Sequence, residues 1–356
     1  MRKSNGQPQL VYETEFGRAF RGDARRLLGQ RSTHIKPGSV DLIFTSPPFA
    51  LTRPKDYGNK SQDTYLEWFA TFLPAFKRAL SPTGSLVVDV GGSWLPGAPR
   101  RSTYHFALAL EIEKQLELCQ EFYWYNPAKL PGPAEWVNRR RLRVKDSVNL
   151  ILWYAKDAAK AKAHNREVQR RYSESMQSLL KSGYQVRRRP SNHEISAKFL
   201  ANNGGAIPSN LVGFPWPDSN HASDLEGEPF EQSIDNLVAI SNTSSTDRYL
   251  RMCKERGLKP HGARFPLGLP SFFILLLTDK GDLVCDPFAG SNTTGEAAQA
   301  AERHWVSIDL DAEGDFAGTY VLTSSFRFPD ARFARGQGKF PLPNWESPAQ
   351  QVRPTA

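Results

Sequence analysis

The sequence predicts an α/β fold built on an open, mainly parallel sheet with helices on both faces. Two strand-type runs, 41–45 and 283–286, each end at a turn of polar and conformationally special residues, and a helix pattern follows the second turn directly. A third run, 84–90, is almost continuously apolar, which is typical of a strand buried on both faces. In such a sheet, ligands bind at the carboxyl ends of the strands.

Strands and covering helices alternate through the first 156 residues, after a polar arm at 1–12 that we expect to be loose. Apolar side chains spaced along one helix face predict the helices, and short β-branched or aromatic runs predict the strands. In chain order these elements are a strand at 16–20, a helix ending near Gln30, the strand at 41–45, a helix at 63–80, a strand at 84–90, a helix at 104–118, and strands at 122–125 and 148–154 that we expect to pair antiparallel at the sheet edge.

The sheet pattern is interrupted from residue 157 to about 258, where apolar periodicity weakens and Arg, Asn, Ser, Gly and Pro become frequent. We expect this region to be an insertion outside the sheet. Within it, 214–238 is acidic and loop-like, and its role is not assigned. The pattern then returns with a helix within 260–278, a strand at 283–286, a helix at 296–303, a strand at 305–308 and a last helix at 315–326.

The first turn is Ser46-Pro47-Pro48-Phe49. Each proline fixes its own φ and lacks an N–H, and the residue before a proline is extended, so this turn is stiff and non-helical. It offers a hydroxyl, free backbone carbonyls and an aromatic ring, which together can accept hydrogen bonds from a planar amino group and stack on the base that carries it. An ordinary Pro-Pro loop after a buried strand is the alternative for these four residues taken alone.

The second turn follows Asp286 and leads into a helix and then a strand that ends in Asp309. A strand–turn–helix–strand unit with an acid at the second strand's tip is typical of nucleoside binding, because the acid can hold ribose hydroxyls. Gly290 and Gly295 have the spacing of a phosphate-binding loop, but Glu296 stands where that loop needs a lysine. The pattern therefore favours a nucleoside cofactor without phosphates.

With both turns in hand, the sequence resembles the DNA amino-methyltransferases, and among them the PvuII-type cytosine-N4 enzymes of the circularly permuted beta group. The catalytic motif is Ser46 to Phe49, and Asp286 to Gly295 is similar to the family's S-adenosylmethionine motif. One departure is Asn292, where the family usually has its second glycine. Further similar segments are 45–50, 57–59, 122–124, 135–138, 203–205 and 263–266, so the resemblance spans about residues 40–310.

The resemblance implies a Rossmann-like sheet, permuted so that the catalytic motif precedes the cofactor motif, and it implies methyl transfer from S-adenosylmethionine. Its catalytic residues would be Ser46, Pro47, Pro48 and Phe49, acting on a flipped base by direct in-line transfer. The cofactor-binding residues that it implies are Asp23, Thr45, Phe265, Asp286, Phe288, Gly290, Ser291, Asn292, Thr293, Thr294 and Asp309. Asp23 has a second interpretation, because aspartate is also a good helix N-cap.

The domain organisation follows from the resemblance and from the change of composition. We expect 1–156 to be the catalytic part and 259–328 the cofactor-binding part of one methyltransferase domain. Residues 157–258 would be the DNA target-recognition region, and 329–356 a disordered tail.

A formal net charge of +9 favours an anionic partner. Duplex DNA is the partner that the resemblance implies, and the predicted contacts are Arg139, Arg140, Arg141, Arg143, Lys145, Arg187, Arg188, Arg189 and His193. A solvated basic face is the alternative for these side chains.

Several other activities compete with cytosine-N4 methylation. Adenine-N6 methylation is the nearest, although the first motif residue there is usually Asp or Asn and here is Ser46. Cytosine-C5 chemistry needs a Pro-Cys nucleophile, which the sequence lacks. Methylation of RNA or of a protein amide fits the large basic insertion less well than duplex DNA does. A DNA-binding module with a vestigial catalytic fold conflicts with two intact motifs.

The remaining sequence features concern location and partners. No run of eighteen apolar residues and no secretory h-region is present, and Cys119, Cys253 and Cys285 suit a reducing bacterial cytoplasm. No His and Cys spacing indicates a metal. We expect a monomer with no membrane contact, and the resemblance suggests a restriction-modification system whose endonuclease forms no stable complex with it.

Overall fold

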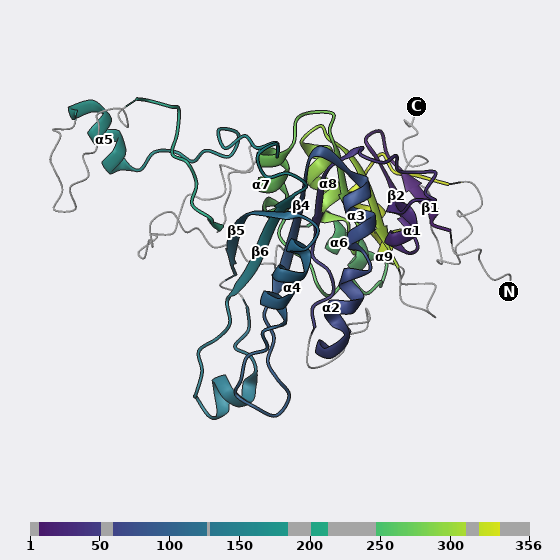
Figure 1. Cartoon of the computed structure of the whole chain (residues 1–356), viewed down its shortest axis with the longest axis horizontal. Coiled ribbons are helices and arrows are strands. Elements are labelled where there is room, and N and C mark those ends of the chain that lie inside the picture. Colours follow the sequence, from purple (N-terminus) through teal and green to yellow (C-terminus); the bar gives the residue numbers. More distant parts are fainter. Residues whose placement is uncertain are drawn as a thin grey trace, which may run out of the picture.

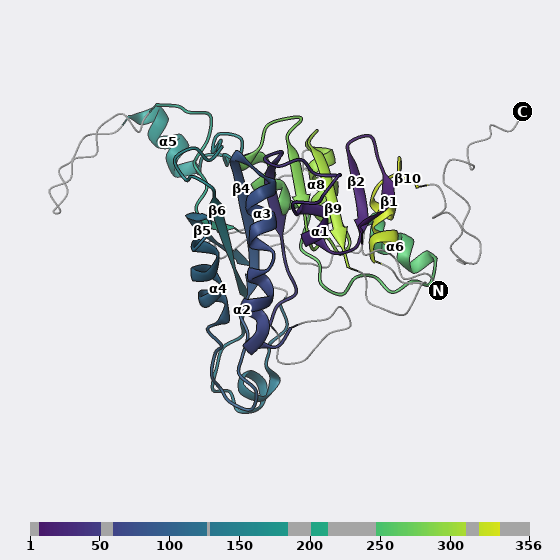
Figure 2. The ribbon, with the colours of Figure 1, turned by 45° about the vertical axis from the view of Figure 1, so that its right-hand side comes forward.

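A computed structural model describes residues 7–50, 60–126, 129–183, 201–212, 247–310 and 320–334 of the chain. Within these residues ten strands form one sheet, with helices packed on both of its faces (Figures 1 and 2). The strands are β1 (Gln9–Glu13), β2 (Gly17–Arg21), β3 (Val40–Thr45), β4 (Leu80–Gly91), β5 (Glu117–Tyr125), β6 (Val148–Ala155), β7 (Leu211–Val212), β8 (Leu283–Asp286), β9 (His304–Asp309) and β10 (Arg332–Phe333).

Seven of the described helices form two layers, one on each face of the sheet, which confirms the predicted α/β class. On one face α1, α2, α3 and α4 bury side chains such as Leu27, Phe69 and Leu108 against Ile43 and Val88. On the other face α7, α8 and α9 pack against Leu42 and Phe44. The helices are α1 (Ala24–Leu28), α2 (Gln62–Ala70), α3 (Leu73–Ala79), α4 (Tyr104–Glu113), α5 (Glu174–Ser182), α6 (Arg248–Glu255), α7 (Gly268–Leu277), α8 (Thr293–Ala300) and α9 (Tyr320–Ser324), with a π-helical turn η1 (Glu135–Arg139) and a 3-10 turn η4 (Ser325–Arg327).

The sheet order is β10-β1-β2-β9-β8-β3-β4-β6-β5-β7, so strands from the two ends of the chain lie side by side. The five central strands β2, β9, β8, β3 and β4 are parallel, and their carboxyl ends therefore meet at one edge. Ile43 pairs with Cys285, which places the end of β3 beside the end of β8. Of the two carboxyl-terminal strands that we expect beside the motif strand, 283–286 (β8) pairs with β3, whereas 305–308 (β9) lies one strand further away, between β8 and β2.

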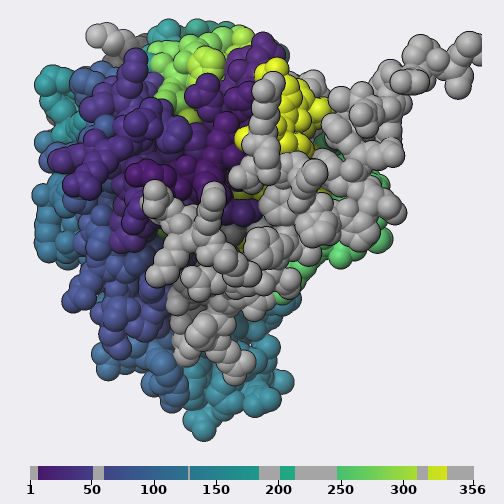
Figure 3. Space-filling view, turned by 90° about the vertical axis from the view of Figure 1, so that its right-hand side faces the viewer, coloured from purple at the N-terminus to yellow at the C-terminus, as the bar shows by residue number. Residues whose placement is uncertain are grey.

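The surface also shows that the first and last parts of the described chain are neighbours. In Figure 3 the residues of the amino-terminal part, in purple, adjoin residues near the carboxyl-terminal end of the described chain, in yellow. β10 pairs with β1, and Tyr12 faces Phe333 across this pair.

Several predicted elements differ from the structure. The arm predicted as loose contains β1, which pairs antiparallel with β2. The helix predicted at 63–80 is two helices, because Pro74 lacks an N–H and sits in the first turn of α3. The helix predicted at 104–118 ends at Glu113, and β5 begins at Glu117, five residues earlier than predicted.

Two predicted boundaries also shift. The region 157–258 is predicted to lie outside the sheet, but Leu211–Val212 pairs with β5 as an added edge strand. The prediction of a disordered tail from residue 329 is wrong for its first residues, since Arg332–Phe333 form β10. Residues 335–356 and the insertion 214–238 lie outside the described residues.

Candidate active site

The two turns identified in the sequence meet at one buried carboxylate, that of Asp286 at the end of β8. Its Oδ1 accepts a hydrogen bond from Thr45 Oγ1 at 2.8 Å and another from the backbone N–H of Phe288 at 3.1 Å. Its Oδ2 accepts from Thr294 Oγ1 at 2.6 Å. Burial raises the pKa of Asp286 to about 6, against the effect of these donors. Through these hydrogen bonds Asp286 connects Thr45, which directly precedes Ser46, to the turn and the helix that follow β8.

The acid at the tip of β9 holds the other side of the same turn. Asp309 Oδ2 accepts a hydrogen bond from the backbone N–H of Gly290 at 2.7 Å, and the N–H of Ala289 donates to the carbonyl of Ile308 at 3.1 Å. Gly290 has a φ of +49°, and a Cβ there would lie 3.0 Å from the ring of His261. This position therefore favours glycine for both its backbone conformation and its space.

Asn292 explains the departure from the glycine pattern of the resembled family. It has left-handed backbone angles, φ 57° and ψ 41°, and asparagine is among the residues that tolerate this conformation best. Its side-chain oxygen accepts from the N–H of Gly295 at 3.0 Å and so caps α8. Its amide nitrogen donates to the Tyr12 hydroxyl at 3.0 Å. Asparagine thus supplies both the turn and the cap.

The catalytic candidate Ser46 contacts a second buried acid, which the sequence analysis did not identify. Ser46 Oγ donates a hydrogen bond to Asp89 Oδ2 at 3.0 Å, and Asn149 Nδ2 donates to Asp89 Oδ1 at 3.0 Å. Lys129 Nζ donates in turn to Asn149 Oδ1 at 2.8 Å. Asp89 is 2% exposed, and burial raises its pKa to about 6. The sequence did contain a signal for Asp89, because it is an acidic residue within a strand that is otherwise apolar and buried on both faces.

Phe49 lies at the end of β4. A Cβ placed on Gly91 would come within 2.4 Å of the Phe49 ring, so the ring packs directly on that backbone. The Tyr104 hydroxyl donates to the carbonyl of Gly91. Pro47 is buried and Pro48 and Phe49 are half-buried, so the motif packs against the rest of the protein. Its aromatic ring lies at the carboxyl edge of the sheet.

Three further cofactor candidates have clear structural surroundings. Asp23 caps α1, with Oδ1 accepting from the N–H of Arg25 at 2.8 Å, and it forms an ion pair with that arginine. This is the N-cap role that the sequence left open. Phe265 stands edge-on to Phe44 with ring centroids 5.5 Å apart. Phe288 packs against Phe72 with ring centroids 5.0 Å apart.

Ser291 is buried in the same turn as Gly290 and Asn292, and Thr293 and Thr294 are buried at the start of α8. The structure thus brings together the candidates on β3, β8 and β9 at one edge of the sheet.

The basic candidates near residue 140 lie on a lobe that projects beyond the carboxyl edge of β4, at the bottom of Figures 1 and 2. Arg139 and Arg140 pair with Glu135 at 3.5 and 3.1 Å, and the Arg140 guanidinium lies 5.2 Å from the Trp136 ring centroid. Arg143 donates to the carbonyl of Pro99 at 3.0 Å. Arg141 and Lys145 are on the same lobe, while Arg187, Arg188, Arg189 and His193 lie outside the described residues.

The described part of the chain contains no group of three or more His, Cys, Asp and Glu side chains placed to hold a metal ion. None of the described helices is long and apolar enough to cross a membrane.

Comparisons with known proteins agree with this geometry. A family model described as DNA methylase matches residues 40–314. The chain is 40% identical over 325 residues to the Type II methyltransferase M.PvuII of Proteus hauseri, with 90% of this chain and 86% of that protein covered. It is 21% identical over 315 residues to the Type II methyltransferase M.BglII of Bacillus subtilis, with 87% and 69% covered. The solved structure of PvuII DNA methyltransferase (cytosine-N4-specific) matches with a TM-score of 0.65 and 36% identity, covering 91% of this chain and 89% of that one.

Proposed function

This chain belongs to the N6/N4 DNA methylase family, and we propose that it is a site-specific methyltransferase that moves a methyl group from S-adenosylmethionine to the exocyclic N4 of cytosine in duplex DNA. The observation that carries the proposal is the set of hydrogen bonds to Asp286. This carboxylate accepts from Thr45, directly before the Ser-Pro-Pro motif, and from Thr294 at the start of α8, directly after the cofactor turn between β8 and α8. A methyl donor and an amino acceptor held by these two turns would be neighbours. The relative M.PvuII and the matching cytosine-N4-specific structure support the choice of reaction.

The residues of the second turn suit S-adenosylmethionine. Asp309 ends β9 beside the N–H of Gly290, where a carboxylate can serve ribose hydroxyls. Asp286 ends β8 just before the turn, and Glu296 at the start of α8 stands where a phosphate-binding loop has its lysine, which suits a cofactor that has no phosphates. When bound, the cofactor supplies an electrophilic methyl group. Thr45, Phe265, Phe288, Ser291, Asn292 and Thr293 complete the proposed binding set, with Asp23 at the end of β2.

Ser46 and Asp89 provide the acid–base chemistry. The amino group of cytosine is a poor nucleophile, because its lone pair is conjugated with the ring. Ser46 directs its own proton toward Asp89, so its oxygen lone pairs are free to accept an N–H of the substrate. A backbone carbonyl of the Pro47-Pro48 turn accepts the second N–H, which draws the nitrogen toward tetrahedral geometry. The proton released on methylation passes to Ser46, whose own proton moves to the Asp89 carboxylate.

DNA would approach the carboxyl edge of the sheet along the basic lobe. Reaching an amino group that is paired inside a duplex requires the base to be flipped out, and Phe49 at the end of β4 offers it a stacking surface. Arg139, Arg140, Arg141, Arg143 and Lys145 would contact phosphates, which position the duplex without reading its sequence. Arg187, Arg188, Arg189 and His193 remain proposed contacts of the recognition region, 157–258.

The biological setting is also proposed. M.PvuII and M.BglII are Type II methyltransferases, which supports a role in a restriction-modification system. A cognate endonuclease would recognise the same site without forming a stable complex, and the methyltransferase would act as a monomer in the bacterial cytoplasm.

The test compares the half-buried Ser46 with the buried Ser85. Ser46→Ala removes the hydroxyl that faces Asp89, whereas the control Ser85→Ala removes a hydroxyl on β4 that accepts a hydrogen bond from Trp153 Nε1 at 2.8 Å. Transfer of labelled methyl from S-adenosylmethionine to unmethylated duplex DNA should fall about 10²- to 10⁴-fold in Ser46→Ala alone. Cofactor affinity should stay near that of the parent in both variants. Equal transfer by Ser46→Ala and the parent would contradict the proposed role.

A further inference from the structure

A buried arginine from the carboxyl-terminal part of the chain is hydrogen-bonded to the cofactor turn between β8 and α8. Arg327 ends the 3-10 turn η4, and its side chain is only 4% exposed. Its Nε donates to the carbonyl of Ser291 at 2.6 Å, and its Nη2 donates to Ser291 Oγ at 3.2 Å. Its Nη1 forms an ion pair with Glu296 in the first turn of α8. One guanidinium thus contacts both the turn and the start of the helix that follows it.

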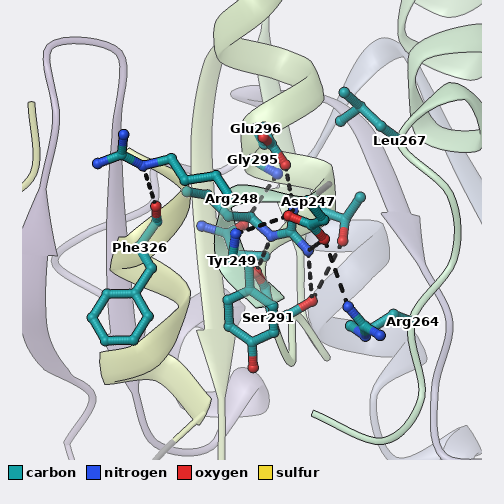
Figure 4. Close-up of polar contacts among 12 residues, drawn as sticks. Asp247, Arg248, Tyr249, Arg264, Leu267, Ser291, Gly295, Glu296 and Phe326 are labelled. Atoms are coloured by element: carbon teal, nitrogen blue, oxygen red, sulfur yellow. Dashed lines mark hydrogen bonds and ion pairs between the residues drawn. The ribbon is translucent and has the colours of Figure 1, made fainter. Parts of the chain in front are cut away.

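Two acids and a ring compensate the buried charge. Asp247, the N-cap of α6, lies 3.5 Å from Arg327 Nη2 and 3.6 Å from Arg264 Nη1. The Tyr249 ring centroid lies 5.0 Å from the Arg327 guanidinium carbon. Figure 4 shows Asp247, Ser291 and Glu296 converging on one point, with Tyr249 and Arg264 beside them. A buried ion is tolerated where such partners surround it, and removing one partner is costly.

The consequence for the turn lies in the peptide between Ser291 and Asn292. Its carbonyl oxygen is held by Arg327, and its N–H donates to the carbonyl of Ala289 at 2.7 Å. The plane of this peptide is therefore fixed from both sides. The residues on either side of Ser291 both have positive φ, which is a sparsely populated conformation for Asn292. A turn of this kind keeps a single shape only when its surroundings hold it.

We propose that Arg327 is a positioning residue of the cofactor site, which keeps the 290–292 backbone in the shape that receives the nucleoside part of S-adenosylmethionine. This inference rests on the proposed function. Arg327 does not touch the reacting atoms in this account, so it acts on cofactor affinity and leaves the chemical step alone. Glu296, which occupies the position of a phosphate-loop lysine, acts here as a counterion for Arg327.

The test uses Arg327→Lys, which keeps the charge but cannot contact Ser291 and Glu296 in the same fork geometry. The matched control is Arg303→Lys. Arg303 is 5% exposed and lies just after α8, at the opposite end of that helix, where its guanidinium donates to Thr278. Glu296→Gln is a milder second variant, since it keeps Arg327 and removes one counterion. Binding of S-adenosylmethionine is measured by isothermal titration calorimetry, and methyl transfer is measured at saturating cofactor and DNA.

We expect the Kd for S-adenosylmethionine to rise about tenfold or more in Arg327→Lys, since hydrogen bonds to charged groups are the stronger ones. A smaller rise is expected in Glu296→Gln and none in Arg303→Lys, with kcat and the KM for DNA near those of the parent throughout. An unchanged Kd in both Arg327→Lys and Glu296→Gln, or an equal rise in Arg303→Lys, would overturn the inference alone. A parent chain that does not bind S-adenosylmethionine would overturn the proposed function together with it.

Discussion

Replacement of Asp89 by asparagine should make the protein more stable at neutral pH and much less active. Asp89 is 2% exposed, and burial raises its pKa from 3.8 to about 6 although Ser46 and Asn149 both donate to it. Because the folded-state pKa is the higher one, the stabilisation from the bound proton is fully present below pH 3.8 and is lost as the pH rises through about 6. At neutral pH the parent therefore holds an unfavourable buried charge.

The size of the effect follows from the shift. At pH 5, about one unit below the folded-state pKa of about 6, the bound proton stabilises the fold by about 1.4 kcal/mol relative to pH 8. Asp89→Asn lacks this titration, so its stability advantage over the parent should grow by about 1.4 kcal/mol between pH 5 and pH 8. Asp286 titrates in the same range, but it is present in both proteins and its contribution cancels.

The assay is urea unfolding of the parent and of Asp89→Asn at pH 5, 6, 7 and 8, followed by single-turnover methyl transfer. The transfer rate of the parent should fall as the pH drops below about 6, because the proton acceptor becomes neutral. The variant should transfer about 10²- to 10⁴-fold more slowly at every pH. A stability difference that does not change with pH would refute the buried-charge reasoning, and parent-like transfer by Asp89→Asn would refute the proton-acceptor role.

Three other predictions concern the turn and the lobe. Asp309→Ala should weaken S-adenosylmethionine binding with little effect on transfer at saturating cofactor, because the turn loses the acceptor for the Gly290 N–H; calorimetry that gives the parent affinity would count against this. Asn292→Ala should lower the free energy of unfolding by about 1–2 kcal/mol in urea titrations, since the helix cap is lost and alanine is strained at φ 57°. Asn292→Gly should lower the free energy of unfolding by less, because glycine adopts this backbone conformation without strain. Equal losses in the two variants would argue against the backbone explanation. The double variant Arg140→Gln, Arg143→Gln should bind DNA more weakly, and its slope of log affinity against log salt should fall by about 0.9 for each phosphate that the protein no longer neutralises. The control Lys280→Gln, at the opposite edge of the sheet, should leave this slope unchanged. A parent-like slope in the double variant would show that these arginines do not contact DNA phosphates.

The position of the site could be predicted because it depends on the parallel sheet. Once 41–45 and 283–286 are recognised as parallel strands, their carboxyl ends must share an edge, and the turns after them must be neighbours. The sequence pattern alone contains this information. The left-handed Asn292 was also within reach, since asparagine is one of the few residues other than glycine that adopt this conformation routinely.

The residues that were missed come together only through strand register and distant packing. Asn149 reaches Asp89 because β6 pairs antiparallel with β4, with Asp89 opposite Ile151 and Gly91 opposite Asn149. Arg327 is 36 residues from Ser291, and it lies beyond a segment whose helix pattern was predicted but whose packing was not. β1 and the short strand β10 have little apolar periodicity, so their pairing with each other was not visible in the sequence.

The most direct test of the central claim is the identity of the modified base. The purified protein is incubated with S-adenosylmethionine and unmethylated genomic DNA, and the digested nucleosides are analysed by mass spectrometry. We expect N4-methylcytosine in the parent reaction and its near absence with Ser46→Ala. N6-methyladenine, or no modified base although the cofactor is bound, would contradict this expectation.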